Sequence, residues 1–388
     1  MRKVLWLASW YPNRVSPFDG DFIQRHARAV SGFCKVQLIY VVKDTTGSIT
    51  AGREEMTTGN LTEWIIYYHS PKTGIKILDR FLSQRKYNRL YRNAINEYIH
   101  ANGKPGCVNV HIAMKAGLAA LWIKKKWGIP FIVSEQWGAY LPEADNRIEN
   151  HSFLYRMALE RVIRKAAMIT VVSDHLGRAI QKHYPGVQFR VIQNVVDTRT
   201  FFPAERTPGN KLQLIHVSNM NYQKNTEAIL QALQMLNKTH PRFVIDLFGT
   251  ANANLLKLIG ELGLEDKVFL RGEVPHPQLA KAMQAADALV LYSRYETFGC
   301  VLIEANACGT PVIVSDLEVF HELVTENVNG IFAKGEDPIE LAKKMLEFIE
   351  HENIFNRTEI ASLTAEKYNF AVIGTQFLHL YNDVPGRM

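Results

Sequence analysis

Short apolar runs rich in β-branched residues alternate along most of the chain with amphipathic segments of about ten to fifteen residues. This alternation is typical of repeated βαβ units, in which each helix connects two parallel strands. The pattern occurs in both halves, so we predict two similar α/β domains with parallel sheets. The expected strands are residues 4–9, 36–42, 108–112, 131–134, 169–173 and 189–192 in the first half, and 212–217, 243–248, 268–270, 288–292, 312–315 and 330–332 in the second.

The boundary between the domains is expected near residues 194–208, where the periodicity is lost and Pro and Gly enter the sequence. We therefore assign residues 1–196 to an N-terminal domain and residues 197–367 to a C-terminal domain. Open α/β sheets bind ligands beyond the carboxyl ends of their strands, so two such domains are expected to face each other across a cleft. The chemistry should lie in the strand-to-helix loops.

The charge of the chain is divided unevenly between its halves. Residues 1–196 carry 28 Lys and Arg against 14 Asp and Glu, a net charge of +14, whereas the remainder carries 17 against 24, a net charge of −7. A basic half suits an acidic substrate, an anionic membrane or nucleic acid. It is equally compatible with a merely soluble basic surface, and charge alone does not choose among these.

Neither a membrane-spanning segment nor a disulfide framework is expected. No run approaches the ~20 uninterrupted apolar residues of a spanning helix, and Pro12 interrupts the apolar start of the chain, so we expect a cytosolic protein. The cysteines show neither CxxC spacing nor a nearby histidine cluster, which favours reduced thiols over disulfides or zinc ligands. They are Cys34, Cys107, Cys300 and Cys308.

The most informative segment is residues 287–316. An apolar strand should end near Ser293, Glu296 follows in the loop, and a helix should begin about Gly299. The first amides of that helix would be free to donate to ligand oxygens. Glu304 lies ~7 Å further along the helix axis, so two carboxylates could hold hydroxyls on two sugars. By its spacing alone, the pair is better explained by a capping acid at Glu296 and a solvated helix residue at Glu304.

Three other loops carry candidate ligand-binding residues. Lys224 directly precedes a helix expected to begin at Asn225 or Thr226, and a cation beside unpaired amides suits a diphosphate. Gly20 follows the first strand, where the backbone could approach a phosphate closely, although any turn would explain one glycine. His111 ends a strand and is, by residue type, as compatible with a core histidine as with a ligand-binding one.

These segments resemble the signature of retaining GT-B glycosyltransferases of family GT4. The resemblance spans most of the chain and is far more specific in the second half. It implies the GT-B fold, with two Rossmann-like domains, and transfer of a sugar from a nucleotide-diphosphate sugar without a metal or other cofactor. UDP-sugar is favoured over GDP-sugar as the donor. The matching run is Glu296, Phe298, Gly299, Glu304, Ala305, Cys308, Gly309, Pro311 and Val312.

The resemblance also implies roles for individual residues. Glu296 and the amides after it would hold the transferred sugar, Glu304 the ribose, and Val274 the base through its backbone. Asn219 stands where the family has an arginine on the diphosphate, and Arg294 or Arg271 could take that role. The catalytic residues would be His111, which reaches the donor sugar, Lys224 and Glu296. The donor-binding residues would be Gly20, Asn219, Lys224, Val274, Glu296, Phe298, Gly299, Cys300 and Glu304.

Other functions compatible with this fold are a nucleotide-sugar epimerase and a non-catalytic sugar-binding protein. A dehydrogenase is disfavoured because no GxGxxG follows an early strand. Near the C-terminus, apolar residues recur at three- and four-residue steps, which predicts a helix over about residues 368–388. In similar proteins such a helix packs back on the first domain. The stripe consists of Phe370, Ile373, Phe377 and Tyr381.

Residues 72–92 are both basic and partly apolar. Their only acid is Asp79. A helix of this composition fits an interfacial segment on anionic lipid, which a surface-polysaccharide enzyme with a lipid-linked saccharide acceptor would need on the inner face of the cell membrane. The apolar residues could instead pack on the sheet below a solvated cationic face, and nucleic acid is not expected as a partner. The cations are Lys72, Lys76, Arg80, Arg85, Lys86, Arg89 and Arg92.

Overall fold

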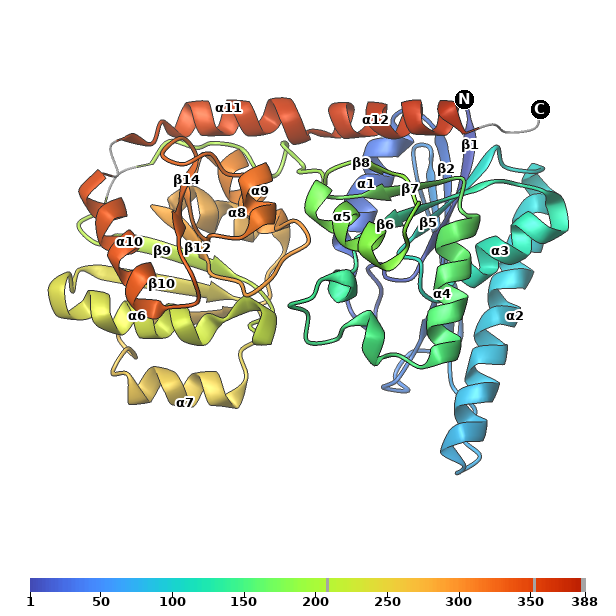
Figure 1. The fold of residues 1–388 in the computed structure, drawn as a ribbon, viewed down its shortest axis with the longest axis horizontal. Coiled ribbons are helices and arrows are strands. Elements are labelled where there is room, and N and C mark those ends of the chain that lie inside the picture. The colour runs from blue at the N-terminus through green and yellow to red at the C-terminus, as the bar shows by residue number, and fades with distance from the viewer. Residues whose placement is uncertain (207–208, 352–353, 385–388) are drawn as a thin grey trace. The chain divides into compact units, whose positions relative to one another are not determined.

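The structure, a computed structural model, describes residues 1–206, 209–351 and 354–384. Two compact units make up the chain, and each is built on a sheet of its own (Figure 1). This confirms the prediction of two α/β domains with largely parallel sheets. Residues 207 and 208 of the expected boundary and residues 385–388 of the predicted last helix lie outside the described residues. Unit 1 comprises Met1–Trp137, Ile148–Val195 and the segment from Phe370, and unit 2 comprises Gly138–Arg147 and Val196–Asn369.

The sheet of unit 1 contains every strand predicted in the first half and two that were not. Its strands are β1 (Lys3–Ala8), β2 (Lys35–Lys43), β3 (Gly52–Thr58), β4 (Leu61–Tyr68), β5 (Cys107–His111), β6 (Phe131–Glu135), β7 (Met168–Val171) and β8 (Phe189–Val191). Their order is β3-β4-β2-β1-β5-β6-β7-β8, and β3 alone among them runs antiparallel to its neighbour. The carboxyl ends of the parallel strands therefore meet at one edge, where α/β proteins bind ligands.

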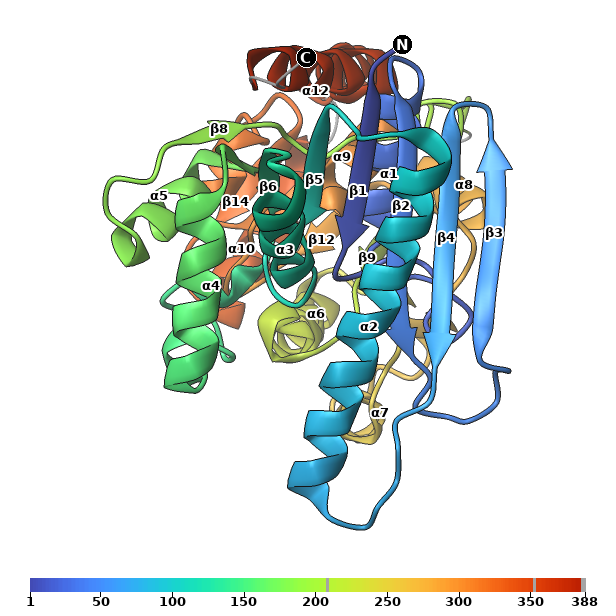
Figure 2. The ribbon, with the colours of Figure 1, turned by 90° about the vertical axis from the view of Figure 1, so that its right-hand side faces the viewer.

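The unpredicted strands β3 and β4 form a hairpin at one side of this sheet (Figure 2). Gly59 and Asn60 connect them, and Gly59 has a φ of 59°, which favours glycine. A two-residue Gly-Asn connection between strand-like runs is a known hairpin signal, so the sequence did contain the information. The hairpin places Tyr68, at the carboxyl end of β4, beside Lys43 at the end of β2.

The helices of unit 1 are α1 (Asp21–Ser31), α2 (Lys76–Asn102), α3 (Ala116–Trp127), α4 (Phe153–Lys165), α5 (Asp174–His183) and α12 (Phe370–Asp383). Helix α12 lies alongside α1 (Figure 1), and at Gly374 a Cβ would be 2.6 Å from the carbonyl oxygen of Ala29. The Tyr381 hydroxyl accepts hydrogen bonds from Trp6 Nε1 at 3.1 Å and from Asn109 Nδ2 at 2.9 Å. The last described helix is thus part of the core of unit 1. No described helix is both long enough and apolar enough to span a membrane.

The sheet of unit 2 is parallel throughout, and all the strands predicted in the second half are present. In the order β11-β10-β9-β12-β13-β14, the two central strands end beside the two loops that the sequence singled out. The strands are β9 (Leu212–Val217), β10 (Phe243–Phe248), β11 (Val268–Gly272), β12 (Ala288–Leu291), β13 (Val312–Ser315) and β14 (Gly330–Ala333).

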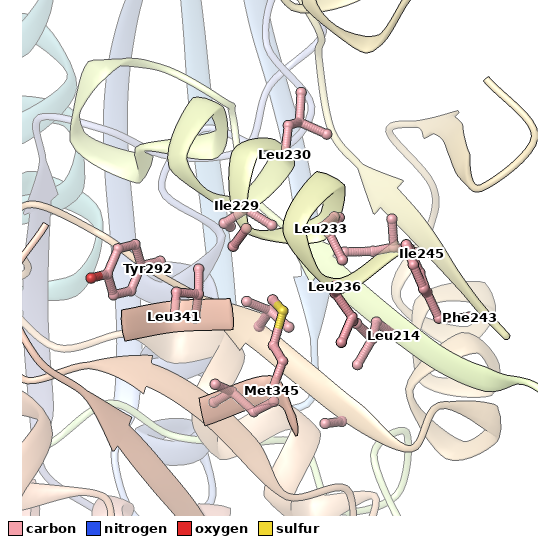
Figure 3. Packing of buried hydrophobic residues seen from close by; sticks show 14 of the residues in the cluster. Leu214, Ile229, Leu230, Leu233, Leu236, Phe243, Ile245, Tyr292, Leu341 and Met345 are labelled. Atoms are coloured by element: carbon pink, nitrogen blue, oxygen red, sulfur yellow. The ribbon is translucent and has the colours of Figure 1, made fainter. Parts of the chain in front are cut away.

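The helices of unit 2 are α6 (Thr226–Thr239), α7 (Ala253–Glu261), α8 (His276–Ala285), α9 (Cys300–Ala307), α10 (Pro338–His351) and α11 (Arg357–Tyr368). The core lies where α6 and α10 meet the sheet, and Figure 3 shows side chains of both helices against those of the strands. Ile229 and Leu233 of α6 and Leu341 of α10 are completely buried there. Burial on this scale fixes the start of α6, and with it the loop after β9.

Candidate functional site

The loops after β9 and β12 bring Lys224 and Glu296 together. Lys224 Nζ forms an ion pair with Glu296 Oε1, and the two side chains are 19% and 6% exposed. The carboxylate also accepts hydrogen bonds from Ser293 Oγ at 3.0 Å and from Gln223 Nε2 at 3.2 Å. A buried carboxylate with three donors is held in one orientation, and its charge is offset by the lysine.

The loop that carries Lys224 is shaped by its backbone. Met220 and Asn225 have φ angles of 48° and 50°, in the left-handed region that non-glycine residues rarely adopt. Asn221 caps the short turn Tyr222–Lys224, whereas Asn225, the N-cap of α6, makes no side-chain cap within the described structure. Helix α6 therefore begins two residues after Lys224 without a side-chain cap on its first amides, and a cation at a helix N-terminus favours an anionic ligand.

Gly249, which was not among the predicted site residues, packs against the backbone of this loop at Ser218. It follows β10 with a φ of 121°, and a Cβ there would lie 1.7 Å from the carbonyl oxygen of Ser218. Ser218 in turn holds the ring of the buried His216, and burial lowers the pKa of His216 to about 4. A glycine directly after a strand was the available sequence signal. The loop thus rests on a contact that only glycine permits.

The second candidate carboxylate lies on α9. The helix begins at Cys300, as predicted, with Gly299 as its N-cap at a φ of 100°. Glu304 is 3% exposed, and Phe298, before the helix, is buried with its ring at 79° to that of Tyr368. Both candidate carboxylates are therefore buried groups of unit 2. The alternative interpretation of Glu304 as a solvated helix residue is wrong.

The remaining residues proposed for the donor lie on other loops of unit 2. Asn219 is exposed in the Lys224 loop, and the half-buried Val274 follows β11. Of the two candidates for the missing arginine, Arg294 packs its guanidinium 4.3 Å from the ring of Tyr222, on the same turn as Lys224. Arg271 is paired with Asp246 at 2.7 Å. Arg294 is also paired, with Glu336 at 3.2 Å, so it is its position beside the turn of Lys224 that favours it as the second cation.

Two family matches cover most of the chain. Residues 197–363 match the family Glycosyl transferases group 1, and residues 62–200 match Glycosyltransferase Family 4. The chain belongs to the GT4-type glycosyltransferases. The family resemblance stated from the motifs is thereby confirmed.

Individual relatives of this glycosyltransferase are distant in sequence. A D-inositol 3-phosphate glycosyltransferase of Paenarthrobacter aurescens is 24% identical over 297 residues, which are 67% of this chain and 71% of that protein. An N-acetyl-alpha-D-glucosaminyl L-malate synthase of Bacillus anthracis is 25% identical over 234 residues, which are 57% of this chain and 61% of the relative.

Solved structures share the fold at still lower identity. A sucrose-phosphate synthase from Thermosynechococcus elongatus has a TM-score of 0.80 at 18% identity, covering 98% of both chains. Anabaena HepE in complex with UDP-glucose has a TM-score of 0.72 at 17% identity, covering 98% of this chain and 100% of that one. At these identities the likeness shows the fold, and it confirms the GT-B type.

In the structure of the glycosyltransferase, His111 is a buried residue of unit 1. Its ring is completely buried in unit 1, with its centroid 3.9 Å from that of Trp6, and neither ring nitrogen has a hydrogen-bond partner among the described residues. Burial and the nearby His26 hold the pKa of His111 well below its usual value. The structure thus places a neutral His111 in the core of unit 1, and its role toward the donor sugar stays a prediction.

Gly20 is required by the protein's own backbone. It is the N-cap of α1 with a φ of 66°, and a Cβ at this position would lie 2.6 Å from the carbonyl carbon of Trp10. The expectation that a phosphate dictates the glycine is therefore unnecessary. The turn still leaves the amino end of α1 at the carboxyl edge of the sheet in unit 1.

A segment from the first half of the chain contributes to the surroundings of Glu296. Gly138–Arg147 belongs to unit 2, and Asp145 Oδ1 accepts a hydrogen bond from the Tyr295 hydroxyl at 2.6 Å. Burial and the Asp145 carboxylate raise the pKa of Tyr295. The residue before Glu296 is thus held by a contact across 150 positions of sequence. No local pattern predicts such a contact.

Proposed function

We propose that this glycosyltransferase transfers a sugar from a nucleotide-diphosphate sugar to a saccharide or lipid-linked saccharide acceptor with retention of anomeric configuration. The observation that carries the proposal is the Lys224–Glu296 pair, which lies at the open N-terminus of α6. A cation at a helix N-terminus suits the diphosphate, and the carboxylate beside it suits a sugar hydroxyl.

The reaction in this proposal depends on stabilising the leaving diphosphate. As the glycosyl–phosphate bond breaks, negative charge grows on the phosphate oxygens, which the Lys224 ammonium and the first amides of α6 would stabilise. The acceptor hydroxyl approaches from the same face, and a leaving phosphate oxygen accepts its proton. Because these groups already supply positive potential, we propose that no metal or cofactor is needed.

The remaining donor contacts follow the geometry of unit 2. The proposal assigns the transferred sugar to Glu296 and the amides at the start of α9, the ribose to Glu304, and the base to the backbone at Val274. A UDP-sugar is the favoured donor, and the solved structure of Anabaena HepE with UDP-glucose supports that choice at the level of the shared fold. Asn219 would face the diphosphate without charge, and Arg294 would provide the second cation.

The acceptor side of the proposal belongs to unit 1. Its net basic charge and the basic segment of residues 72–92 favour an acceptor at an anionic surface, in surface polysaccharide synthesis on the inner face of the cell membrane. A polyprenyl-type or other lipid-linked saccharide would satisfy both the charge and the family's sugar chemistry.

Turnover with UDP-glucose tests the reaction class. We expect UDP to be released only when an acceptor is present and the product to keep the anomeric configuration of the donor, as measured by NMR. An epimerase would instead convert the donor, or release UDP, without any acceptor. A non-catalytic sugar-binding protein would bind UDP-glucose and leave it unchanged. Either of these results would reject the transferase proposal.

Calorimetry with UDP and UDP-glucose tests the separate roles of the two carboxylates. We expect Glu304→Ala to weaken UDP binding about tenfold, equivalent to ~1.4 kcal/mol. Glu296→Gln should spare UDP, because it frees Lys224 for the diphosphate, and should weaken recognition of the intact donor. Glu350→Ala, an exposed acid on α10, is the matched control. Equal losses of UDP affinity in both site variants would contradict the assignment.

A further inference from the structure

Large apolar side chains of unit 1 are exposed at the beginnings of two helices. Those at the start of α2 and in the first turns of α4 keep between 40% and 84% of their area in solvent. Exposed apolar residues that gather at one place mark an interaction surface more often than scattered ones do. The residues, hereafter the apolar tip, are Ile75, Ile77, Leu78 and Phe81 of α2 and Phe153, Leu154 and Met157 of α4.

Topology brings both groups to one end of unit 1. Helix α2 follows β4 and helix α4 follows β6, so both begin at the carboxyl edge of the sheet. In Figures 1 and 2 the first half of α2 extends beyond the strands, and the beginning of α4 points toward the same end. The apolar tip is therefore built from separate helices at the edge where α/β proteins bind substrates.

The rest of α2 explains why its first turns are free. Tyr87, Tyr91 and Ile95 are buried, and the Tyr91 hydroxyl donates to the carbonyl oxygen of Ala8 at 2.7 Å. The apolar residues of the later turns thus pack on the sheet, as one interpretation of the sequence held. Ile77 and Phe81 of the first turns do not.

Cations lie beside the part of the apolar tip that α2 carries. In the described part of the chain, none of the seven Lys and Arg of residues 72–92 forms an ion pair. The acid of the segment, Asp79, accepts hydrogen bonds from the backbone amide and the hydroxyl of Thr73. Lys86 donates to the carbonyl oxygen of His69, and Arg92 lies over the ring of Trp122. The other five cations are exposed and leave a net positive surface beside the apolar side chains.

We propose that unit 1 docks on an anionic lipid bilayer through the apolar tip and the exposed cations of α2. Apolar side chains of this size enter the headgroup boundary, while the neighbouring cations remain near the lipid phosphates. A bilayer offers apolar chains beneath a layer of anionic head groups, which matches both kinds of side chain. We therefore assign the surface to lipid. Nucleic acid would match the cations and leave Ile77 and Phe81 in water.

A cavity beside the tip links docking to catalysis, and this link rests on the proposed function. The cavity is about 700 Å³ in volume and is lined by Lys76, Arg80 and Ser83 of α2 together with Ser9, Lys43 and Tyr68 at or just beyond the strand ends. One face of the first turns of α2 thus lines a polar, basic cavity, while other side chains of the same turns form the tip. The head group of a membrane-held acceptor would enter this cavity without leaving the bilayer.

Co-sedimentation of the full chain with vesicles tests the docking surface. We expect binding to vesicles of phosphatidylcholine and phosphatidylglycerol, little binding to phosphatidylcholine alone, and weaker binding in high salt. Ile77→Ser/Phe81→Ser and, separately, Phe153→Ser/Leu154→Ser should each lower the affinity at least tenfold. Arg85→Glu/Arg89→Glu should do the same and remove the salt dependence. These residues are exposed, so the fold should tolerate the changes.

Two controls make the outcome decisive. Leu256→Ser, an exposed apolar residue on α7 of unit 2, should bind vesicles as the wild type does. Every variant should keep the wild-type affinity for UDP, which reports on unit 2 and separates failure of docking from failure of the proposed function. No sedimentation of the wild type at low salt, or unchanged binding by the serine variants, would overturn the proposal. Binding to duplex DNA without binding to vesicles would assign the surface to nucleic acid instead.

Discussion

The carboxyl edges of the two sheets hold their charged groups in opposite ways. In unit 2, Lys224 is paired with Glu296, and Ser293 and Gln223 complete the hydrogen bonds of a carboxylate that is 6% exposed. In unit 1, exposed cations of α2 stand unpaired within the described structure beside exposed apolar side chains. A buried and paired site presents fixed donors to a small ligand, whereas an exposed mixed surface suits a large and fluid partner. One fold, used twice, can thus supply both kinds of recognition.

The most severe test of this contrast is Lys224→Ala. If unit 2 carries the chemistry, the loss of this ammonium should lower kcat about 10²- to 10³-fold, as expected for removing one preorganised donor to a developing charge. Vesicle binding should not change, because the tip lies in unit 1. Steady-state turnover and co-sedimentation of the same preparation measure both quantities.

The control for this variant is Lys238→Ala, at the other end of α6 and exposed. It removes the same charge from the opposite end of α6 and should leave kcat within about a factor of two. A loss of less than about threefold in Lys224→Ala would place the main stabilisation of the diphosphate elsewhere, with Arg294 as the next candidate.

A smaller effect is expected from Tyr381→Phe, which compares the stabilities of the two units. The change removes the acceptor for two buried donors, Trp6 Nε1 and Asn109 Nδ2. Leaving such donors unsatisfied should lower the free energy of unfolding of unit 1 by ~1–3 kcal/mol. Urea unfolding followed by fluorescence should show the transition of unit 1 shifted and that of unit 2 unchanged.

Tyr222→Phe serves as the matched change, since Tyr222 is 56% exposed. Its stability should stay within about 0.5 kcal/mol of the wild type. If Tyr381→Phe is equally neutral, the two hydrogen bonds to the Tyr381 hydroxyl contribute little to the stability of unit 1.

The smallest effect should come from removing metal ions. With Lys224 and the helix N-termini providing the positive potential, turnover should persist in excess EDTA. Restoration of a lost activity by magnesium or manganese would show that the charges of unit 2 are insufficient by themselves. The donor site of unit 2 would then require a bound metal ion in addition to its own charged groups.

The predictions from the sequence were more accurate for the loops of unit 2 than for unit 1. The loops after β9 and β12 were located correctly because each one is a local pattern: an apolar strand, a short polar loop and a helix start at Thr226 or Cys300. The ion pair of Lys224 with Glu296 could not be derived, since it joins residues 72 positions apart. Sequence periodicity reports elements and their ends, and contacts between loops depend on sheet order.

Errors in unit 1 have equally physical causes. The β3–β4 hairpin was missed because the exposed strand β3 has no buried face to give an alternating pattern, and only Gly59-Asn60 signalled the turn. The complete burial of His111 could not be predicted, because a residue at the end of a strand faces either the loop or the core, and residue type does not decide which. Residues 72–92 were recognised as basic and apolar, but which apolar residues pack on the sheet depended on where β4 ended.

The return of α12 to unit 1 sets an order of events during protein synthesis. Ile373, Phe377 and Tyr381 belong to the buried core of unit 1, yet the ribosome makes them only after all of residues 196–369. At about 5 to 20 residues per second, this delay is on the order of 10 to 40 s. Throughout it the nascent first unit lacks the helix that covers Trp6, and the chain of unit 2 is finished before that of unit 1. A chaperone that shields the uncovered groove beside α1 would therefore act on the part of the chain that was synthesised first.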